Sequence, residues 1–275
     1  MNRRPMPLSV DGHAVYAATG GRAHAAGRPL AVLLHGAGMD HCAWALQSRW
    51  LAFHGWNVLA LDLPGHGTSA GTPLPSIGAM SAWLIALLDG FAAADLTLIG
   101  HSMGALIALE TAAAVPERIR RLALIGAAAA MPVHADLLAA AKAGDHAAID
   151  MVNLWGHGFR AGLGESAAPG LWMTGVGARI LESARPGVLH ADLAACAAYE
   201  GGIAAAARVT AAALVFCGEK DQMTPLKSGR ALAAALPHAT LVVAPGAGHM
   251  LPAERPDQLL AALARHLRED AAATA

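Results

Sequence analysis

The segment GHSMG at 100–104 places Ser102 between two glycines, directly after an apolar run of strand length and directly before a helical pattern. A serine hydroxyl attacks a carbonyl carbon only when a base removes its proton and its oxygen projects from the backbone. A sharp strand-to-helix turn supplies that projection, and flanking glycines let the strand and the helix approach closely. The pattern therefore predicts that Ser102 is a nucleophile. The alternative is an ordinary serine that caps a helix.

A base for this serine is present near the end of the chain, at His249. It follows an apolar run at 240–244 and a glycine-rich loop, so its imidazole is expected at the carboxyl edge of a sheet. An imidazole pKa of about 6.5 allows the ring to take the serine proton and to return it to a leaving group at neutral pH. The alternative is a loop histidine without a catalytic role, but none of the other histidines stands in such a loop after the last predicted strand.

Two carboxylates, Glu219 and Asp221, follow the apolar run that ends at Cys217. A carboxylate at this place could accept a hydrogen bond from the second imidazole nitrogen, which fixes the tautomer of the base and stabilises the imidazolium. The residue types and their order therefore point to a triad of serine, histidine and an acid, with either carboxylate as the acid.

The elements that must position these residues are short apolar runs that alternate with helical patterns. Near-continuous apolar strands separated by helices predict a mostly parallel, doubly wound α/β sheet that is covered on both faces. Weaker signals at 7–10 and 13–17 indicate an edge hairpin. The main predicted strands are residues 30–35, 56–62, 96–100, 119–126, 211–217 and 240–244.

The alternation stops between about residue 131 and residue 208. A loop of that length without structure of its own would be unusual, so helices are the better interpretation. The sequence therefore predicts an α/β core at 1–130 and 209–275, with a helical cap at 131–208 inserted into it. Helical patterns occur around 135–143, 145–155, 170–184 and 188–199.

Five segments together resemble the α/β-hydrolase superfamily, and in particular its capped serine hydrolases, which include esterases, lactonases and C–C bond hydrolases. The resemblance runs from about residue 35 to the last helix, and it implies the chain order nucleophile, acid, base. The acid of that pattern stands three residues after Gly218 and before a Thr-Pro pair, which selects Asp221 over Glu219. The segments are LLHGAG at 33–38, LDLPGHGTS at 61–69, GHSMG at 100–104, GEKDQMTP at 218–225 and GAGHM at 246–250.

The resemblance also implies an oxyanion hole formed by the backbone N–H groups of Ala37 and Met103. Loss of one such donor typically costs about 2.7 to 4 kcal/mol of barrier stabilisation. The alternative for this loop is a glycine-rich turn without a ligand. We expect His35 to brace the loop, and Asp62 and His66 to form a turn and not to react.

A cap over the triad would form the wall of a substrate pocket. Its apolar character favours a small to medium, largely uncharged, ester-like substrate. Large side chains at helical spacing are often core residues, so only about half of the candidates are expected to contact substrate. The candidates for substrate binding are Met151, Trp155, His157, Trp172 and Met173.

Other activities remain open at this stage. C–C bond hydrolases, enol-lactonases and cofactor-free perhydrolases use the same triad, and a ligand receptor that does not hydrolyse anything can be built on the same fold. An aspartate nucleophile is disfavoured because Ser102 occupies its position. The sequence lacks a P-loop, a G-x-G-x-x-G after the first strand and clustered metal ligands, so we expect no cofactor and no metal.

Composition weighs against several classes of partner. The 19 Lys and Arg against 20 Asp and Glu give a formal charge of -1, which provides no field for nucleic acid. The apolar stretches end before the roughly 20 residues that a membrane span needs, and no secretory signal is recognised. We therefore expect a cytoplasmic monomer or homodimer. The cysteines at positions 42, 196 and 217 lack C-x-x-C spacing and are expected to be reduced structural thiols in the core.

Overall fold

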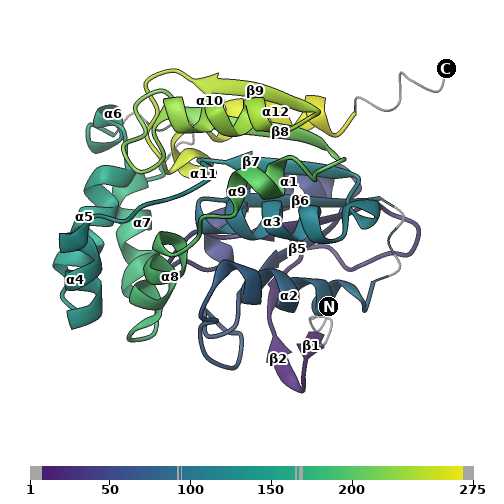
Figure 1. Cartoon of the computed structure of the whole chain (residues 1–275), viewed down its shortest axis with the longest axis horizontal. Coiled ribbons are helices and arrows are strands. Elements are labelled where there is room, and N and C mark those ends of the chain that lie inside the picture. Colours follow the sequence, from purple (N-terminus) through teal and green to yellow (C-terminus); the bar gives the residue numbers. More distant parts are fainter. Residues whose placement is uncertain (1–7, 92, 94, 165, 167–169, 269–275) are drawn as a thin grey trace.

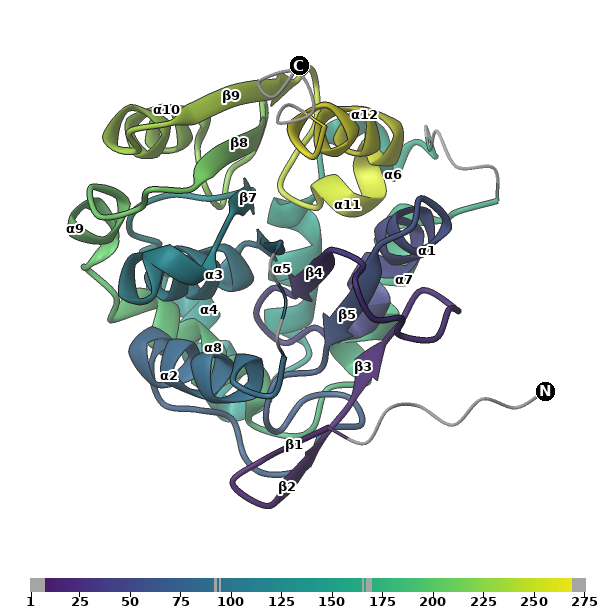
Figure 2. The same ribbon diagram turned by 90° about the vertical axis from the view of Figure 1, so that its right-hand side faces the viewer.

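The computed structural model describes residues 8–91, 93, 95–164, 166 and 170–268. Its main sheet has the strand order β3-β5-β4-β6-β7-β8-β9 (Figures 1 and 2). The strands from β4 to β9 pair in parallel, and β3 runs antiparallel to β5 at one edge. The expected mostly parallel α/β sheet is thus confirmed. The strands are β3 (Ala17–Ala18), β4 (Leu30–Leu34), β5 (Asn57–Leu61), β6 (Leu96–His101), β7 (Arg121–Ile125), β8 (Ala212–Gly218) and β9 (Ala239–Ala244).

The central strands β4 to β7 are buried along their whole length, which explains why their sequences are apolar on both faces. Strand β9 is largely half-buried because it lies at the edge of the sheet, so the expectation of burial on both faces is wrong there. A separate two-stranded hairpin joins β1 (Leu8–Val10) to β2 (His13–Val15), as the weak early signals indicated. Pro7 of that prediction lies outside the described residues.

Helices cover both faces of the sheet, as Figure 2 shows. On one face, α2, α3 and α10 enclose the larger apolar cluster, and on the other face α1 and α12 enclose a second cluster. This layering explains why parallel strands are stable here, since the helices shield most of both faces from water. The core helices are α1 (Ala45–Phe53), α2 (Ile77–Leu88), α3 (Met103–Ala114), α10 (Leu226–Ala235), α11 (Leu251–Glu254) and α12 (Pro256–His266).

We call residues 131–208, between β7 and β8, the inserted segment. Its helices α4 to α8 gather beyond one end of the sheet, at the left of Figure 1. Helices α4, α5, α7 and α8 share a small apolar cluster that includes Leu137, Val152 and Leu193, and Met250 of the core packs into it. The last helix of the segment, α9, packs against α3 instead. The helices are α4 (Ala135–Ala143), α5 (Ala147–Gly156), α6 (Phe159–Gly162), α7 (Met173–Glu182), α8 (Val188–Ala197) and α9 (Gly202–Ala206).

The patterns at 135–143, 145–155, 170–184 and 188–199 correspond to α4, α5, α7 and α8. The short helices α6 and α9 were not predicted, because four or five residues are too few for a helical period to emerge. Among the helices of the described residues, none combines the length and the apolar character that crossing a membrane requires.

Candidate active site

Ser102 forms the turn between β6 and α3, with φ 55° and ψ -120°. A positive φ is unusual for a residue with a Cβ and costs about 1 to 3 kcal/mol, so the surrounding structure must hold it. The backbone N–H of Ser102 donates to the carbonyl of Ile125 at 2.9 Å, and its carbonyl accepts from the N–H of Ala105 at 2.8 Å. The turn is therefore anchored to both the neighbouring strand and the helix.

The two glycines of the segment are required by close contacts. A Cβ on Gly100 would lie 2.2 Å from the carbonyl oxygen of Gly104, and a Cβ on Gly104 would lie 2.2 Å from the carbonyl oxygen of Leu34. Backbone atoms on strands and helices cannot move aside for a methyl group, so only glycine fits at either position. These contacts are the physical reason for glycine on both sides of Ser102.

Asp221 and His249 lie together after β8 and β9, and both are buried. The imidazole donates from Nδ1 to Oδ2 of Asp221 at 2.8 Å. The hydroxyl of Thr224 donates to the same oxygen at 2.6 Å, while the N–H groups of Met223 and Thr224 donate to Oδ1 at 2.8 Å each. Burial alone would raise the pKa of Asp221, but His249 and these donors hold that pKa below its usual value. The carboxylate is thus ionised and oriented.

Glu219, the other candidate acid, faces away from this pair. It accepts a hydrogen bond from the N–H of Gly246 at 2.9 Å and lies 3.4 Å from the ammonium of Lys220. The bond from Gly246, followed by Lys220, lowers the pKa of Glu219. Its carboxylate therefore stabilises a surface loop, and the structure brings Asp221, not Glu219, against His249.

Besides its bond to Asp221, His249 is held through both groups of its backbone. Its backbone N–H donates to the carbonyl of Gly156 in α5 at 2.8 Å, and its carbonyl accepts from Nε2 of His101 at 2.9 Å. Its own Nε2 is buried and has no hydrogen-bond partner in the described part of the chain. Since Ser102 and His249 line the same cavity, this nitrogen is free to exchange a proton with a group there.

His101 supports the base and carries no charge. Burial, with His249 nearby, lowers its pKa to about 3. The neutral ring must then carry its proton on Nε2 to donate to the carbonyl of His249. The sequence offered no signal for this role, because the position between Gly100 and Ser102 is variable in the motif and a neutral structural histidine has no characteristic spacing.

A second bridge joins the inserted segment to the loop that carries His249. One oxygen of the buried Glu254 accepts from the N–H of Gly158 at 2.9 Å and from that of Gly248 at 3.1 Å. Together with the bond from His249 to Gly156, this places the end of α5 against the candidate base.

The loop at 36–38 follows β4, and Ala37 lines the same cavity as Ser102. Met103 begins α3, so its N–H belongs to the helix N-terminus, although its side chain is buried. His35 braces the loop as expected. Burial lowers its pKa to about 3, and the neutral ring donates from Nδ1 to Gly36 at 2.9 Å and accepts the N–H of Leu63 at 3.2 Å.

The turn after β5 is built around Asp62, as anticipated. This buried carboxylate accepts the backbone N–H groups of His41 and Thr68 at 2.8 Å each, and Gly67 has no room for a Cβ beside it. His66 does more than form the turn. Its Nε2 donates to Asp192 of the inserted helix α8 at 2.8 Å.

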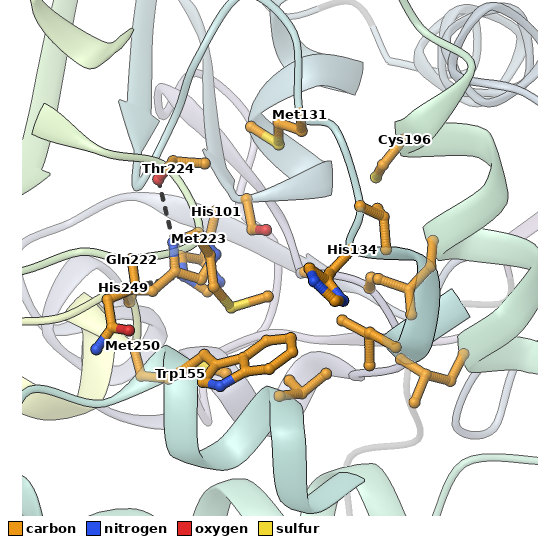
Figure 3. Close-up of a pocket in the computed structure, with 18 of the residues that line it drawn as sticks. His101, Met131, His134, Trp155, Cys196, Gln222, Met223, Thr224, His249 and Met250 are labelled. Carbon is orange, nitrogen blue, oxygen red and sulfur yellow. Dashed lines mark hydrogen bonds between the residues drawn. The ribbon is translucent and has the colours of Figure 1, made fainter. Parts of the chain in front are cut away.

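The cavity beside Ser102 has a volume of about 280 Å³. In Figure 3, His249 and Thr224 lie on one side and His134 and Cys196 on the other, with Met131 above and Trp155 below. The inserted segment supplies much of the lining, and most of the side chains are apolar. Lining residues that sequence reasoning did not single out include Met131, Leu137, Val152, Leu189, Leu193, Met223 and Met250.

The five predicted substrate contacts fall in different places. Trp155 lines the main cavity. His157 and Met173 line a second, smaller cavity of about 80 Å³, which shares Met39, His101 and Met250 with the first. Met151 is half-buried in the apolar cluster of the inserted segment, and Trp172 is 71% exposed, so neither lines these two cavities. Helical spacing marks a residue as facing a core but does not say which cavity it reaches.

The three cysteines are free thiols. Cys196 and Cys217 are buried, but Cys42 is exposed, so the expectation of a core thiol is wrong for Cys42.

In the described residues, donor atoms of Asp40, His41 and Cys42 lie within 4.8 Å of one another. Local bonds explain this grouping, because Asp40 caps the N–H of Cys42 at 2.7 Å and His41 pairs with Asp62 at 2.8 Å.

Comparisons with known proteins identify the family of the fold. A family model described as "Alpha/beta hydrolase family" matches residues 31–263. The enol-lactonase from Burkholderia xenovorans LB400 superposes with a TM-score of 0.84 at 26% identity, covering 95% of this chain and 99% of that one. A pimeloyl-[acyl-carrier protein] methyl ester esterase of Chromobacterium violaceum is 29% identical over 271 residues, which is 88% of this chain and 96% of the esterase.

Other relatives match only in part. The dihydrolipoyllysine-residue acetyltransferase component of the acetoin cleaving system of Pseudomonas putida is 42% identical over 103 residues, which cover 37% of this chain and 27% of that protein. The shared part is thus a minor portion of that longer protein. Because the family model matches most of the sequence, the chain belongs to the alpha/beta hydrolase family.

Proposed function

We propose that this protein is a serine hydrolase that cleaves a carboxylic ester of a small to medium apolar substrate through an acyl-enzyme on Ser102. The observation that carries the proposal is the 2.8 Å hydrogen bond between Asp221 and His249, beside a cavity that Ser102 also lines. A histidine oriented by an ionised acid and a serine on a strained turn are the parts that nucleophilic acyl transfer needs.

In the proposed reaction, Oγ of Ser102 attacks the ester carbonyl carbon while Nε2 of His249 takes the hydroxyl proton. The carbonyl oxygen becomes an oxyanion that the N–H groups of Ala37 and Met103 stabilise. Collapse of the tetrahedral intermediate expels the alkoxide, which receives the proton from His249. A water molecule, activated by the same imidazole, then releases the acid and restores Ser102.

The lining of the cavity favours an uncharged substrate. Its lining is mostly apolar, from Met131, Leu137, Trp155 and their neighbours, and its volume of about 280 Å³ suits a short acyl or aryl group. An enol-lactone is a cyclic ester and would react by the same steps. The similarity to the Burkholderia enol-lactonase makes lactone cleavage the second candidate.

The nucleophile is tested by labelling. An aryl sulfonyl fluoride or a phosphonate is expected to add one label to Ser102, which peptide mass spectrometry locates. Turnover is expected to fall in proportion to the fraction of protein that is labelled. Ser102→Ala is the matched control and is expected to take no label. A label on another serine, or none on protein that hydrolyses esters, contradicts the proposal.

The substrate class is tested with p-nitrophenyl esters from acetate to decanoate, beside an enol-lactone and a vinylogous 1,5-diketone, with and without chelator. Turnover of esters is expected without added metal or cofactor. Trp155→Ala is expected to change relative kcat/KM along the series by about 10-fold, since one methylene contact is worth roughly 1 to 3 kcal/mol. Trp172→Ala, at an exposed position, is the control and is expected to leave the profile unchanged.

The other outcomes of this panel are equally informative. Strong cleavage of the lactone or the diketone with negligible ester cleavage would assign the protein to one of the alternative enzyme classes. Binding without turnover of any substrate would favour a ligand receptor.

A further inference from the structure

A fully buried carboxylate connects the inserted segment to the loop of the proposed oxyanion hole. Asp192 in α8 has 0% of its surface exposed. Its Oδ2 accepts the backbone N–H of Gly38 at 2.8 Å and also accepts Nε2 of His66 at 2.8 Å. The three residues come from three separate parts of the chain, so this oxygen joins the oxyanion loop, the turn after β5 and the inserted helix.

Packing at Gly38 reinforces the same contact. A Cβ on Gly38 would lie 2.8 Å from Cδ1 of Leu189 in α8 and 3.2 Å from Cδ2 of Leu181 in α7. Gly38 has a φ of +68°, which glycine tolerates without strain. Two inserted helices therefore press on the residue that directly follows Ala37, and Asp192 holds the amide of that same residue.

His66 completes the connection as a cation. Its Nδ1 faces the carbonyl of Pro64 at 3.0 Å and its Nε2 faces Asp192, so both ring nitrogens must be donors, which only the imidazolium satisfies. Burial opposes this charge, but the bond to Asp192 raises the pKa of His66. The adjacent ring of His35, with centroids 4.8 Å apart, stays neutral. Arg185 of the inserted segment also binds this turn, through the carbonyl of Ser69 at 2.7 Å.

We infer that Asp192 is a positioning residue for the reaction: by holding the amide of Gly38, it sets the orientation of the Ala37 N–H toward the oxyanion, so the inserted helix α8 completes the oxyanion hole. The inference rests on the proposed function, because Ala37 is a donor only in that mechanism. A purely structural carboxylate would stabilise the fold without distinguishing the transition state from bound substrate or product.

The decisive experiment compares Asp192→Ala with Asp192→Asn, whose amide oxygen can still accept from Gly38. Asp192→Ala is expected to lower kcat for p-nitrophenyl acetate by 10- to 100-fold, with KM changed less than about 3-fold. The affinity for an aryl boronic acid, which mimics the tetrahedral intermediate, is expected to fall by the same factor, while that for benzoate, a product-like acid, stays constant. Asp192→Asn is expected to recover most of both losses.

The matched control is Tyr199→Phe. The hydroxyl of Tyr199, which follows α8, donates to Glu110 of α3 at 2.6 Å, so this variant removes a contact between the inserted segment and the core that lies outside the oxyanion loop. It is expected to leave kcat and boronate affinity unchanged. Should Asp192→Ala not fold, Asp192→Ser replaces it, since its hydroxyl oxygen lies one bond closer to the backbone than Oδ2 and cannot take the place of Oδ2, and a selective loss of 3-fold or more is expected.

Hydrogen exchange gives a measurement without a substrate. The peptide that contains Gly38 is expected to exchange faster in folded Asp192→Ala than in the wild type, and Tyr199→Phe is expected to leave it unchanged. Equal loss of boronate and benzoate affinity, or unchanged kcat, would overturn the inference while the wild type remains an esterase. Absence of ester turnover and of Ser102 labelling in the wild type would instead identify a failure of the proposed function itself.

Discussion

Replacing Asp221 by asparagine changes one carboxylate oxygen into an amide nitrogen and leaves the size of the side chain almost unaltered. The N–H groups of Met223 and Thr224 both point at Oδ1, at 2.8 Å. An amide nitrogen cannot accept these bonds, so the asparagine oxygen stays with the two N–H groups. The amide nitrogen then occupies the place of Oδ2, opposite Nδ1 of His249.

The size of the effect follows from this geometry. An amide nitrogen at that place donates to Nδ1 of His249, so the neutral imidazole carries its proton on Nε2. Nε2 is the atom that must accept the proton of Ser102, so the ring is held in the wrong tautomer. A block of this kind lowers turnover by about 10⁴-fold, which corresponds to roughly 5 kcal/mol of barrier.

The assay is p-nitrophenyl acetate hydrolysis at pH 7, with thermal unfolding measured in parallel to show that Asp221→Asn is folded. Glu219→Gln is the control, since Glu219 contacts a surface loop, and it is expected to keep kcat within about 2-fold of the wild type. The reasoning is refuted if folded Asp221→Asn keeps more than a tenth of the wild-type kcat, or if Glu219→Gln is the variant that loses activity.

Three further predictions concern stability and are checked by urea or thermal unfolding. Ser102→Gly is expected to raise the free energy of unfolding by about 1 kcal/mol, because glycine adopts φ 55° without strain, and no change would show that the turn is relaxed. Gly104→Ala is expected to lower it by about 3 kcal/mol, because the added Cβ meets the carbonyl of Leu34, and a wild-type melting temperature would contradict this. The pKa of His101 is about 3, below the ordinary 6.5, so near pH 5 its ring stays neutral in the folded protein but becomes charged in the unfolded chain. The contribution of this residue to stability is therefore lost as the pH falls from 6.5 toward 3. His101→Gln is expected to reduce the fall in the free energy of unfolding between pH 6.5 and 5 by about 2 kcal/mol, and an unchanged slope would refute this prediction.

The sheet and the order of the candidate triad were accessible from sequence because their signals are local. A strand buried on both faces must be apolar along its length, as β4 and β6 are, and the turn at Ser102 must have glycine where backbones meet. Asp221 could be preferred over Glu219 only through the family pattern. Both carboxylates follow β8, and which one turns inward depends on donors such as Thr224 that are recognised only in three dimensions.

The features that sequence reasoning missed depend on contacts between distant segments. Asp192 lies in a mostly apolar helix without a recognisable motif, and its partners Gly38 and His66 are more than 100 positions away. Trp155 and Trp172 have the same residue type and similar surroundings in the sequence, yet one lines the cavity and the other is exposed. Helical periodicity identifies which face is buried, and tertiary packing decides what that face meets.

The bonds from the end of α5 to the loop of His249 have a consequence for protein engineering. The carbonyl of Gly156 accepts from His249 and from Met250, and Glu254 of the core bridges Gly158 to Gly248. A chimera that exchanges residues 131–208 for the corresponding helices of a relative therefore changes the support of the base along with the shape of the cavity. Such exchanges should retain glycine at 158, where a Cβ would lie 2.7 Å from the carbonyl oxygen of Gly246, or introduce the relative's own loop at 246–254 together with its helices.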